Sequence, residues 1–186
     1  VLWLLYCDPQ KKVLVVSGSL KRAVAFTNFC LALIREVPEL QWLAPRPNQR
    51  QASQAFDVGP ATPDQNPSFH AAGVMSQTVG FRADVVVPDD VETNTNSLTV
   101  LMREKIREAV KEYESVLKPG GHIKFLGTPH DYDSLYNHLV KTGIYTLRIW
   151  PARFPTPKQA RSYGNRLAPY IRHKLEEDPS LVGQPT

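Results

Sequence analysis

The fold is decided by the stretch Ala83-Asp84-Val85-Val86-Val87-Pro88-Asp89-Asp90-Val91-Glu92. Its Val-rich apolar part is typical of a strand that is buried on both faces of a parallel sheet. Two carboxylates follow directly at the C-terminal end of this run. In an open parallel sheet, ligands bind in the crevice outside the carboxyl ends of the strands. The stretch therefore predicts an α/β protein with an acidic site at one edge of its sheet.

Strand and helix patterns alternate along the rest of the chain, as in proteins built on a parallel sheet. Short apolar runs predict strands over 13–17, 55–58, 69–75, 123–126 and 145–150. Apolar spacings of three and four predict helices over 1–7, 19–38, 98–117 and 134–141. A last helix is expected through Leu167 and Leu175, kinked at Pro169. Between Ala44 and Pro67 the chain is too rich in proline for long regular elements.

The composition is that of an ordinary globular protein. Of the 186 residues, 42% are hydrophobic and 22% are charged, which excludes a disordered chain. The net charge of +4 allows contact with DNA or RNA without establishing it. Cys7 and Cys30 lie in apolar surroundings, so we expect buried reduced thiols rather than a disulfide. The opening apolar run, up to Cys7, is too short to span a membrane.

The carboxylates after the strand suit nucleotide hydrolysis. Asp89 is placed to bind magnesium, mainly through the water shell of the ion. A second acid, Asp90 or Glu92, would orient the attacking water or accept its proton. These two residues are two apart, so we expect only one of them to point into the site, and the sequence does not decide which.

Other polar residues at predicted strand ends are candidates for contact with phosphate. Gly127 and Thr128 follow the strand over 123–126, and the Thr128 hydroxyl has the chemistry to sense a γ-phosphate, although a plain turn explains the same residues. Ser17, Lys21 and Arg22 lie where a strand ends and a helix begins. Backbone N–H groups attract phosphate at such a junction, but helix capping accounts for it equally well.

Two further features bear on the site. Arg82 precedes the acidic strand and is a candidate contact to phosphate or DNA, or a residue that stabilises its loop. The five histidines are scattered and accompany no cysteine pair, so we expect no histidine metal site. The phosphate-loop pattern G-x-x-x-x-G-K-[ST] does not occur in these residues.

Several stretches together resemble a known family. They are Asp8-Pro9-Gln10 through Val15-Val16-Ser17, Pro45-Arg46-Pro47 with Gln49-Arg50, Phe56-Asp57-Val58-Gly59-Pro60-Ala61, Arg82-Ala83-Asp84, Asp89-Asp90-Val91-Glu92, Leu126-Gly127-Thr128-Pro129, Trp150-Pro151-Ala152 and Arg166-Leu167-Ala168-Pro169. In this order they resemble the ATPase domain of phage terminase large subunits, and more narrowly the DNA maturase B proteins of short-tailed phages. Each stretch alone is weak, but together they cover nearly the whole chain.

The resemblance implies a fold and a set of roles. The fold would be a parallel-sheet P-loop NTPase-like domain of the additional-strand type. Asp89 would be the magnesium-binding aspartate of the Walker B strand, Asp90 or Glu92 the catalytic carboxylate, and Gly127 with Thr128 the motif that couples hydrolysis to DNA movement. The cofactors would be ATP and Mg²⁺.

The resemblance also implies a biological setting. The partners would be double-stranded DNA, the portal protein, the small terminase subunit and further copies in a ring, without a membrane. The protein would act in the host cytoplasm and transiently at the prohead portal, where it pumps DNA inward, while a nuclease domain of the same protein cuts the DNA.

The phosphate loop and the nuclease domain of the family lie outside these residues. We expect the phosphate loop before Val1 and the nuclease domain after Thr186. Residues 1–177 would then be part of an ATPase domain without its phosphate-loop strand, and residues 178–186 would begin a linker. We therefore expect no ATP hydrolysis from this chain alone. One alternative is a DNA- or portal-binding assembly role without hydrolysis. Another is a two-metal nuclease site, which is weaker because Asp89, Asp90 and Glu92 come from one strand end.

Overall fold

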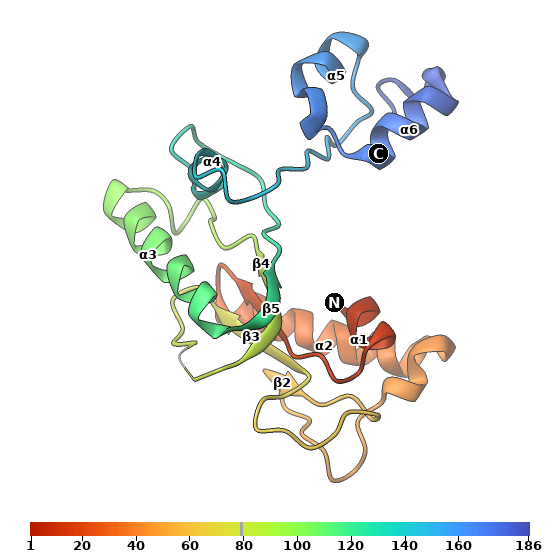
Figure 1. Cartoon of the computed structure of the whole chain (residues 1–186), viewed down its shortest axis with the longest axis vertical. Helices are drawn as coiled ribbons and strands as arrows, with labels where there is room; N and C mark the ends of the chain where they lie inside the picture. The colour runs from red at the N-terminus through yellow and green to blue at the C-terminus, as the bar shows by residue number, and fades with distance from the viewer. Residues whose placement is uncertain (79) are drawn as a thin grey trace. The chain divides into compact units, whose positions relative to one another are not determined.

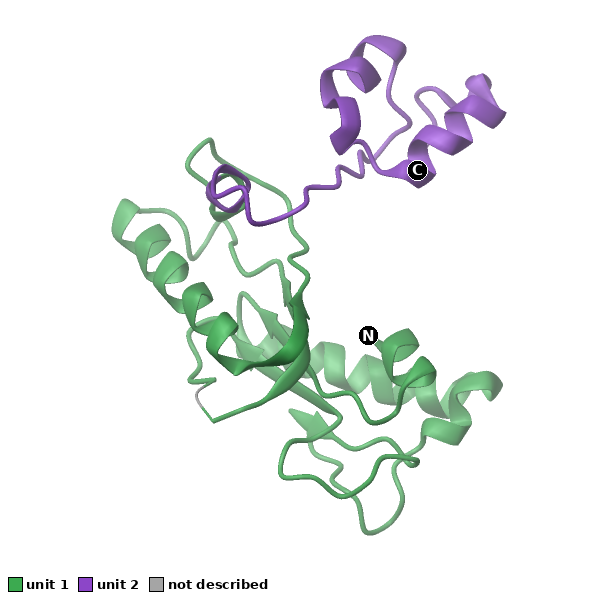
Figure 2. Cartoon of the chain, viewed as in Figure 1, with its two compact units in different colours: residues 1–137 green, residues 138–186 purple. Residues whose placement is uncertain are grey.

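The computed structural model describes residues 1–78 and 80–186. The chain divides into two compact units, 1–137 and 138–186, each drawn in its own colour in Figure 2. The division falls inside the short helix α4 (Leu135–Lys141). The proposed limits of the motor domain and its linker, 1–177 and 178–186, stay predictions.

Unit 1 is built on a five-stranded sheet in the order β2-β3-β1-β4-β5. The strands are β1 (Val13–Ser17), β2 (Ala55–Phe56), β3 (Phe69–Gly73), β4 (Ala83–Asp89) and β5 (Leu117–Ile123). All neighbours are parallel except β2, which is antiparallel to β3. The prediction of an α/β protein with a mainly parallel sheet is therefore confirmed.

Helices cover both faces of this sheet, which explains the continuous apolar strands. All five residues of β1 are buried. Val13 and Val15 pack in the core formed with α2 (Leu20–Glu36), whereas Leu14 and Val16 point to the opposite face, because successive side chains alternate along a strand. Figure 1 shows α1 (Leu2–Cys7) and α2 on one side of the sheet and α3 (Val100–Val116) on the other.

Both long helices begin at side-chain caps. Ser19 precedes α2 and its hydroxyl accepts a hydrogen bond from the backbone N–H of Arg22, 3.4 Å away. Thr99 does the same for α3 through the N–H of Met102, at 3.2 Å. These contacts satisfy N–H groups that have no partner within a helix. The helix predicted over 98–117 begins later than expected, because Leu98 lies before the Thr99 cap and is exposed.

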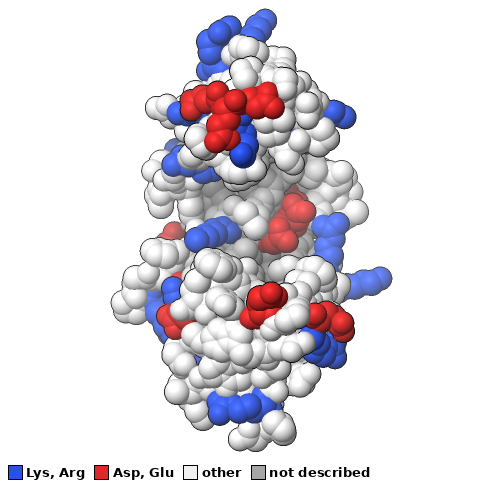
Figure 3. Space-filling model, turned by 90° about the vertical axis from the view of Figure 1, so that its right-hand side faces the viewer, with Lys and Arg blue, Asp and Glu red and all other residues white. Residues whose placement is uncertain are grey.

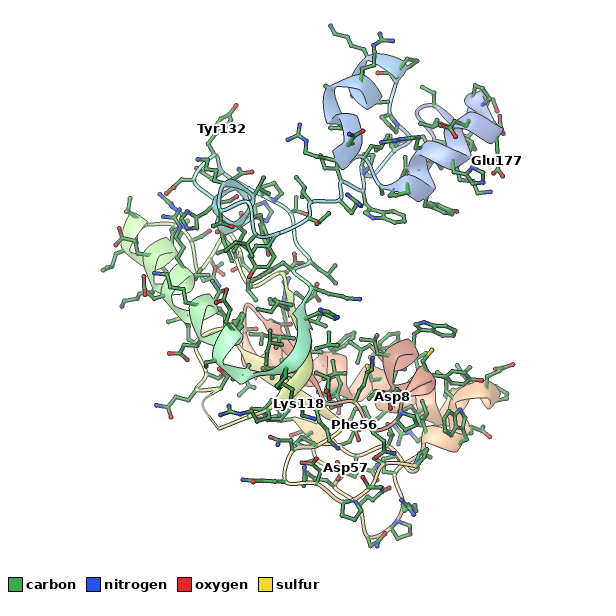
Figure 4. The ribbon with its side chains drawn as sticks, viewed as in Figure 1. Asp8, Phe56, Asp57, Lys118, Tyr132 and Glu177 are labelled. Carbon is green, nitrogen blue, oxygen red and sulfur yellow. The ribbon has the colours of Figure 1, made fainter. Side chains whose placement is uncertain are left out.

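Charged groups fix the amino-terminal edge of the sheet. The Asp84 carboxylate accepts hydrogen bonds from the Lys12 backbone N–H at 2.7 Å and from the Lys118 ammonium at 3.1 Å. One side chain therefore joins the chain entering β1 to β4 and to the start of β5. Figure 4 shows Lys118 at this end and Tyr132 in the loop beyond the other end.

The proline-rich segment 44–67 has no long element, as predicted, and is held by side chains instead. After the 3₁₀ helix η1 (Pro38–Leu43), the Gln49 amide donates to the carbonyls of Val58 and Gly59. Within this segment Phe56 is fully buried and stacks on Phe69, with ring centroids 4.9 Å apart. The loop is thereby anchored to the edge of the sheet at β2 and β3.

Unit 2 has a small core of its own. It contains α5 (Pro157–Tyr163), η2 (Gly164–Arg166), α6 (Pro169–Glu177) and η3 (Pro179–Leu181). Buried Phe154, Leu167, Ala168 and Ile171 form its centre. The chain after α6 folds back onto this core, because the Gly183 N–H donates to the Phe154 carbonyl at 2.9 Å.

Other local predictions were also wrong. The strand expected over 145–150 is replaced by a single bridge between Ile149 and Leu167, because a strand needs a partner along its whole length. The strand expected over 123–126 forms earlier, as β5, and continues beyond it only as a bridge between Leu126 and Asp89. Pro169 does not kink a helix but opens α6, where its missing N–H costs nothing.

The remaining error concerns a thiol. Cys30 is buried, as expected, but Cys7 is exposed, because only Leu5 of α1 is buried. Within residues 1–78 and 80–186, every helix is too short or too polar to cross a lipid bilayer.

Candidate functional site

The ends of three neighbouring strands bring the predicted residues together. In the register of the sheet, Ser17 of β1 is paired with Gly73 of β3 on one side and with Asp89 of β4 on the other. Asp89 is in turn bridged to Leu126, the residue before Gly127. These residues therefore form a row at the carboxyl edge of the sheet, which is where parallel sheets bind ligands.

Asp89 is the best-placed acid of this row. Burial raises the pKa of its carboxyl group, the neighbouring Asp90 raises it further, and the positive charge of Arg22 lowers it. Asp89 is thus a partly desolvated carboxylate whose pKa responds to a second acid and to a cation at the start of α2. A carboxylate with a shifted pKa at a sheet edge is a candidate functional group.

Asp90 and Glu92 have different surroundings. Asp90 is exposed and has a left-handed backbone, with φ of 45°, and its N–H donates to the Leu126 carbonyl at 3.0 Å. Aspartate tolerates this conformation better than most residues. Glu92 is 2% exposed, and its Oε2 accepts a hydrogen bond of 2.6 Å from the Leu135 N–H at the start of α4. Of the two, Asp90 is open to solvent at the edge, whereas Glu92 is used to hold α4.

Tyr136 closes over the turn that follows Leu126. Its hydroxyl donates to the Leu126 carbonyl at 3.3 Å, and burial raises its pKa to about 12. A Cβ atom at Gly127 would overlap the hydroxyl end of the Tyr136 ring and lie 2.6 Å from Cε1. Glycine at position 127 therefore lets the ring lie against the turn. The turn and α4 are joined by this contact and by the bond from Leu135 to Glu92.

Gly18 allows a second close approach, between β1 and the loop after β4. A Cβ atom there would lie 2.7 Å from Thr93 Cγ2 and 2.8 Å from the Asp90 carbonyl oxygen. Any larger residue would push the acidic loop away from the start of α2. This glycine and Tyr136 were missed by the sequence analysis, since neither stands in a pattern that indicates a close contact.

The other predicted residues fall into two groups. Ser17 is buried in the row of strand ends, while Lys21 and Arg22 are exposed in the first turn of α2, and Thr128 is exposed in the turn after Leu126. Together with Gly127, these residues lie around the carboxyl edge with the acids.

Arg82 is separate from the rest. It precedes β4, and its guanidinium donates to the carbonyls of Phe81 and of Ser115 near the end of α3. The seven residues of β4 span about 20 Å at roughly 3.3 Å per residue, so Arg82 lies at the opposite end of the strand from Asp89. The structure thus supports its role in stabilising the loop, and a contact to the same phosphates as Asp89 gains no support.

A magnesium ion fits the charges of this edge. Two adjacent carboxylates, one of them partly desolvated, repel each other, and a divalent cation relieves that repulsion. Among the residues that the structure describes, no cluster of three Asp, Glu, His or Cys side chains could hold a metal alone. The ion would therefore take its remaining ligands from water and phosphate, as magnesium commonly does.

Comparison with known proteins accords with this geometry. The whole chain is 42% identical, over 190 aligned residues, to the terminase large subunit of Enterobacteria phage T3. The chain is a relative of part of that subunit. The predicted resemblance to the terminase large subunits is thus confirmed, and the α/β fold agrees with it. The chain spans about a third (32%) of the length of this relative. No family model matches the chain.

Proposed function

We propose that these residues form the acidic edge of an ATP-hydrolysing motor that packages phage DNA. The observation that carries the proposal is the row of strand ends, in which Asp89 is paired with Ser17 of β1 and bridged to Leu126, directly before the exposed Asp90. The similarity to a terminase large subunit supports the packaging role. By the same similarity, we propose action in the host cytoplasm at the prohead portal, with the portal protein and the small subunit as partners.

Each residue has a proposed task. Asp89 would hold hydrated Mg²⁺, which neutralises charge on the phosphates when it is bound with ATP. Asp90 would orient the attacking water and accept its proton, because it is the exposed acid beside Asp89. Glu92 would position α4 through the Leu135 N–H. Thr128 would sense the γ-phosphate from the turn that Tyr136 covers. The cradle for the phosphates is not among these residues.

The surroundings of the two acids favour Asp90 over Glu92, the choice that the sequence left open. If Glu92 were the catalytic carboxylate, it would have to move out of its buried position, where Oε2 accepts a hydrogen bond from the Leu135 N–H and Oε1 has no hydrogen-bond partner among the described residues. Asp90 needs no such rearrangement. The two-metal nuclease alternative gains no support, because among the described residues no three Asp, Glu, His or Cys side chains come together as a metal-holding group.

The test uses the natural full-length protein with purified proheads and DNA. Nuclease-protected DNA and released phosphate are measured for the wild type, Asp90→Asn and Glu92→Gln, with Glu104→Gln on the exposed side of α3 as a control. We expect Asp90→Asn to abolish both signals while the protein stays folded, and Glu92→Gln to lower stability more than hydrolysis. Full activity of Asp90→Asn would refute the assignment.

The remaining alternative is a DNA- or portal-binding role without hydrolysis. It predicts that the natural full-length protein releases no phosphate from ATP, whereas DNA or portal binding persists. The same assay separates the two functions.

A further inference from the structure

The basic charge of this protein is concentrated in unit 2. Residues 134–175 contain no Asp or Glu, but they contain eight basic residues: Lys141, Arg148, Arg153, Lys158, Arg161, Arg166, Arg172 and Lys174. Unit 2 as a whole has these eight and three acids, a net charge of +5. Because the whole chain carries +4, unit 1 carries −1. The surplus of positive charge in the chain therefore comes from unit 2 alone.

Within the described residues, these cations are hardly neutralised by acids. The guanidinium groups donate instead to backbone carbonyls: Arg148 to Leu147, Arg153 to Gly183, Arg166 to Tyr163 and Arg172 to Gly164. Such bonds orient a guanidinium but leave its charge in place. In the described part of the chain, Lys174 is the cation of unit 2 with an acidic partner, Glu177, at 2.8 Å.

The three acids of unit 2 are grouped at one place. Glu176 and Glu177 end α6, and Asp178 follows them. Figure 3 shows this acidic group on the uppermost body, with Lys and Arg side chains around it, and Figure 4 labels Glu177. The acids thus occupy a limited area, which leaves the surface formed by residues 141–172 positive.

Two more features make this surface suitable for a polyanion. Arg161 and Arg172 line an open hollow of about 360 Å³ between α5 and α6, together with Asn165 and one acid, Glu176. Trp150 and Tyr170 are 62% and 52% exposed and stack on each other, with ring centroids 5.6 Å apart. Exposed arginines and tyrosine hydroxyls donate to the phosphate and sugar oxygens of a duplex.

We propose that unit 2 binds the phosphodiester backbone of double-stranded DNA through its uncompensated cations, Arg148, Lys158 and Arg161 foremost. The proposal rests on the packaging function and names the surface that contacts the DNA. Contacts to phosphate hold a duplex without reading its sequence, as a motor that moves any sequence requires. Charge complementarity selects this unit over unit 1, whose net charge is negative.

The experiment measures binding of a labelled duplex of about 30 base pairs to the 186-residue chain by fluorescence anisotropy, between about 50 and 200 mM salt. A triple variant, Arg148→Gln with Lys158→Gln and Arg161→Gln, removes three charges from unit 2. A control triple, Arg35→Gln with Lys105→Gln and Lys111→Gln, removes three exposed charges from unit 1. The two variants have the same net charge but lose their three positive charges from different units.

For the unit 2 triple we expect affinity to fall at least about tenfold and the salt slope to decrease by up to about three. The control triple should lose much less affinity for the duplex, because the charges that it removes act on DNA only through screened long-range attraction. Equal losses in both triples would overturn the proposal, as would tighter binding of single-stranded than of duplex DNA. Absence of DNA binding would also overturn it. The packaging function does not depend on these results, because the prohead assay with Asp90→Asn tests that function separately.

Discussion

The contact between Gly127 and Tyr136 predicts an unusual cost for the smallest possible substitution. Gly127→Ala adds one methyl group, which would overlap the hydroxyl end of the Tyr136 ring. The clash involves the far end of a side chain, so the ring can swing away without distorting the backbone. Swinging away breaks the 3.3 Å bond from the Tyr136 hydroxyl to the Leu126 carbonyl and exposes a half-buried ring.

The magnitude follows from these losses. A lost hydrogen bond costs about 0.5–1.5 kcal/mol, and inserting a methyl into an occupied space typically costs about 1–3 kcal/mol. Alanine also restricts the unfolded chain, which offsets about 0.4–1 kcal/mol. We therefore expect Gly127→Ala to lower the free energy of unfolding of unit 1 by about 2 kcal/mol, within a range of about 0.5–4 kcal/mol.

A double-mutant cycle isolates the clash. Urea titrations followed by the amide NMR signals of β1 and β4 report the unfolding of unit 1 in Gly127→Ala, Tyr136→Ala and the double variant. If the ring is the obstacle, Gly127→Ala becomes neutral or stabilising once Tyr136 is alanine. A cost of Gly127→Ala that persists in the Tyr136→Ala background would refute the reasoning, since the obstacle would then be something other than the ring.

Three further predictions concern the acids and the thiols. Asp89→Asn should stabilise the chain at neutral pH, because burial and Asp90 raise the pKa of Asp89 in the folded state. The gain in free energy of unfolding should be absent below the unfolded-state pKa of about 3.9, grow as the pH rises from there through the folded-state pKa, and be complete above it. A lower urea midpoint than that of the wild type at neutral pH would contradict this prediction. Glu92→Ala should lower the free energy of unfolding in urea by about 1–3 kcal/mol, because it leaves the Leu135 N–H without an acceptor, and Glu92→Gln should lower it less. If Glu92→Ala were as stable as the wild type, this hydrogen bond would be ruled out. Iodoacetamide should label exposed Cys7 in the native protein but not Cys30, whose pKa burial raises to about 11; mass spectrometry that finds both labelled equally would disprove this packing.

The sequence predicted those elements whose pattern is local. The unbroken apolar run of β1 and the Val-rich part of β4 need no knowledge of their neighbours to be recognised as buried strands, and both formed where expected. Ser19 was also recognisable as a helix start, because a cap needs only residues within one turn, whereas the cap of α3, Thr99, lies inside the helix predicted over 98–117 and was not recognised.

The errors arose where the outcome depends on distant residues. The run over 145–150 has strand-forming residues, yet whether it becomes a strand depends on a partner, and only Ile149 forms a bridge. The fate of Glu92 likewise depends on Leu135, 43 residues away, so its separation from Asp90 alone could not show which acid faces the site. The contact of Gly127 with Tyr136 leaves no periodic signal at all.

The most direct test of the central claim is the rate of ATP hydrolysis by the natural full-length protein with Asp89→Asn, compared with wild type and with Glu104→Gln. If Asp89 holds the magnesium ion of the nucleotide, Asp89→Asn should lower the rate by at least about a hundredfold, because the charge that binds the ion is removed. The Glu104→Gln control should hydrolyse ATP as the wild type does. An Asp89→Asn protein that hydrolyses ATP at the wild-type rate would show that the carboxyl edge of this sheet is not the nucleotide site.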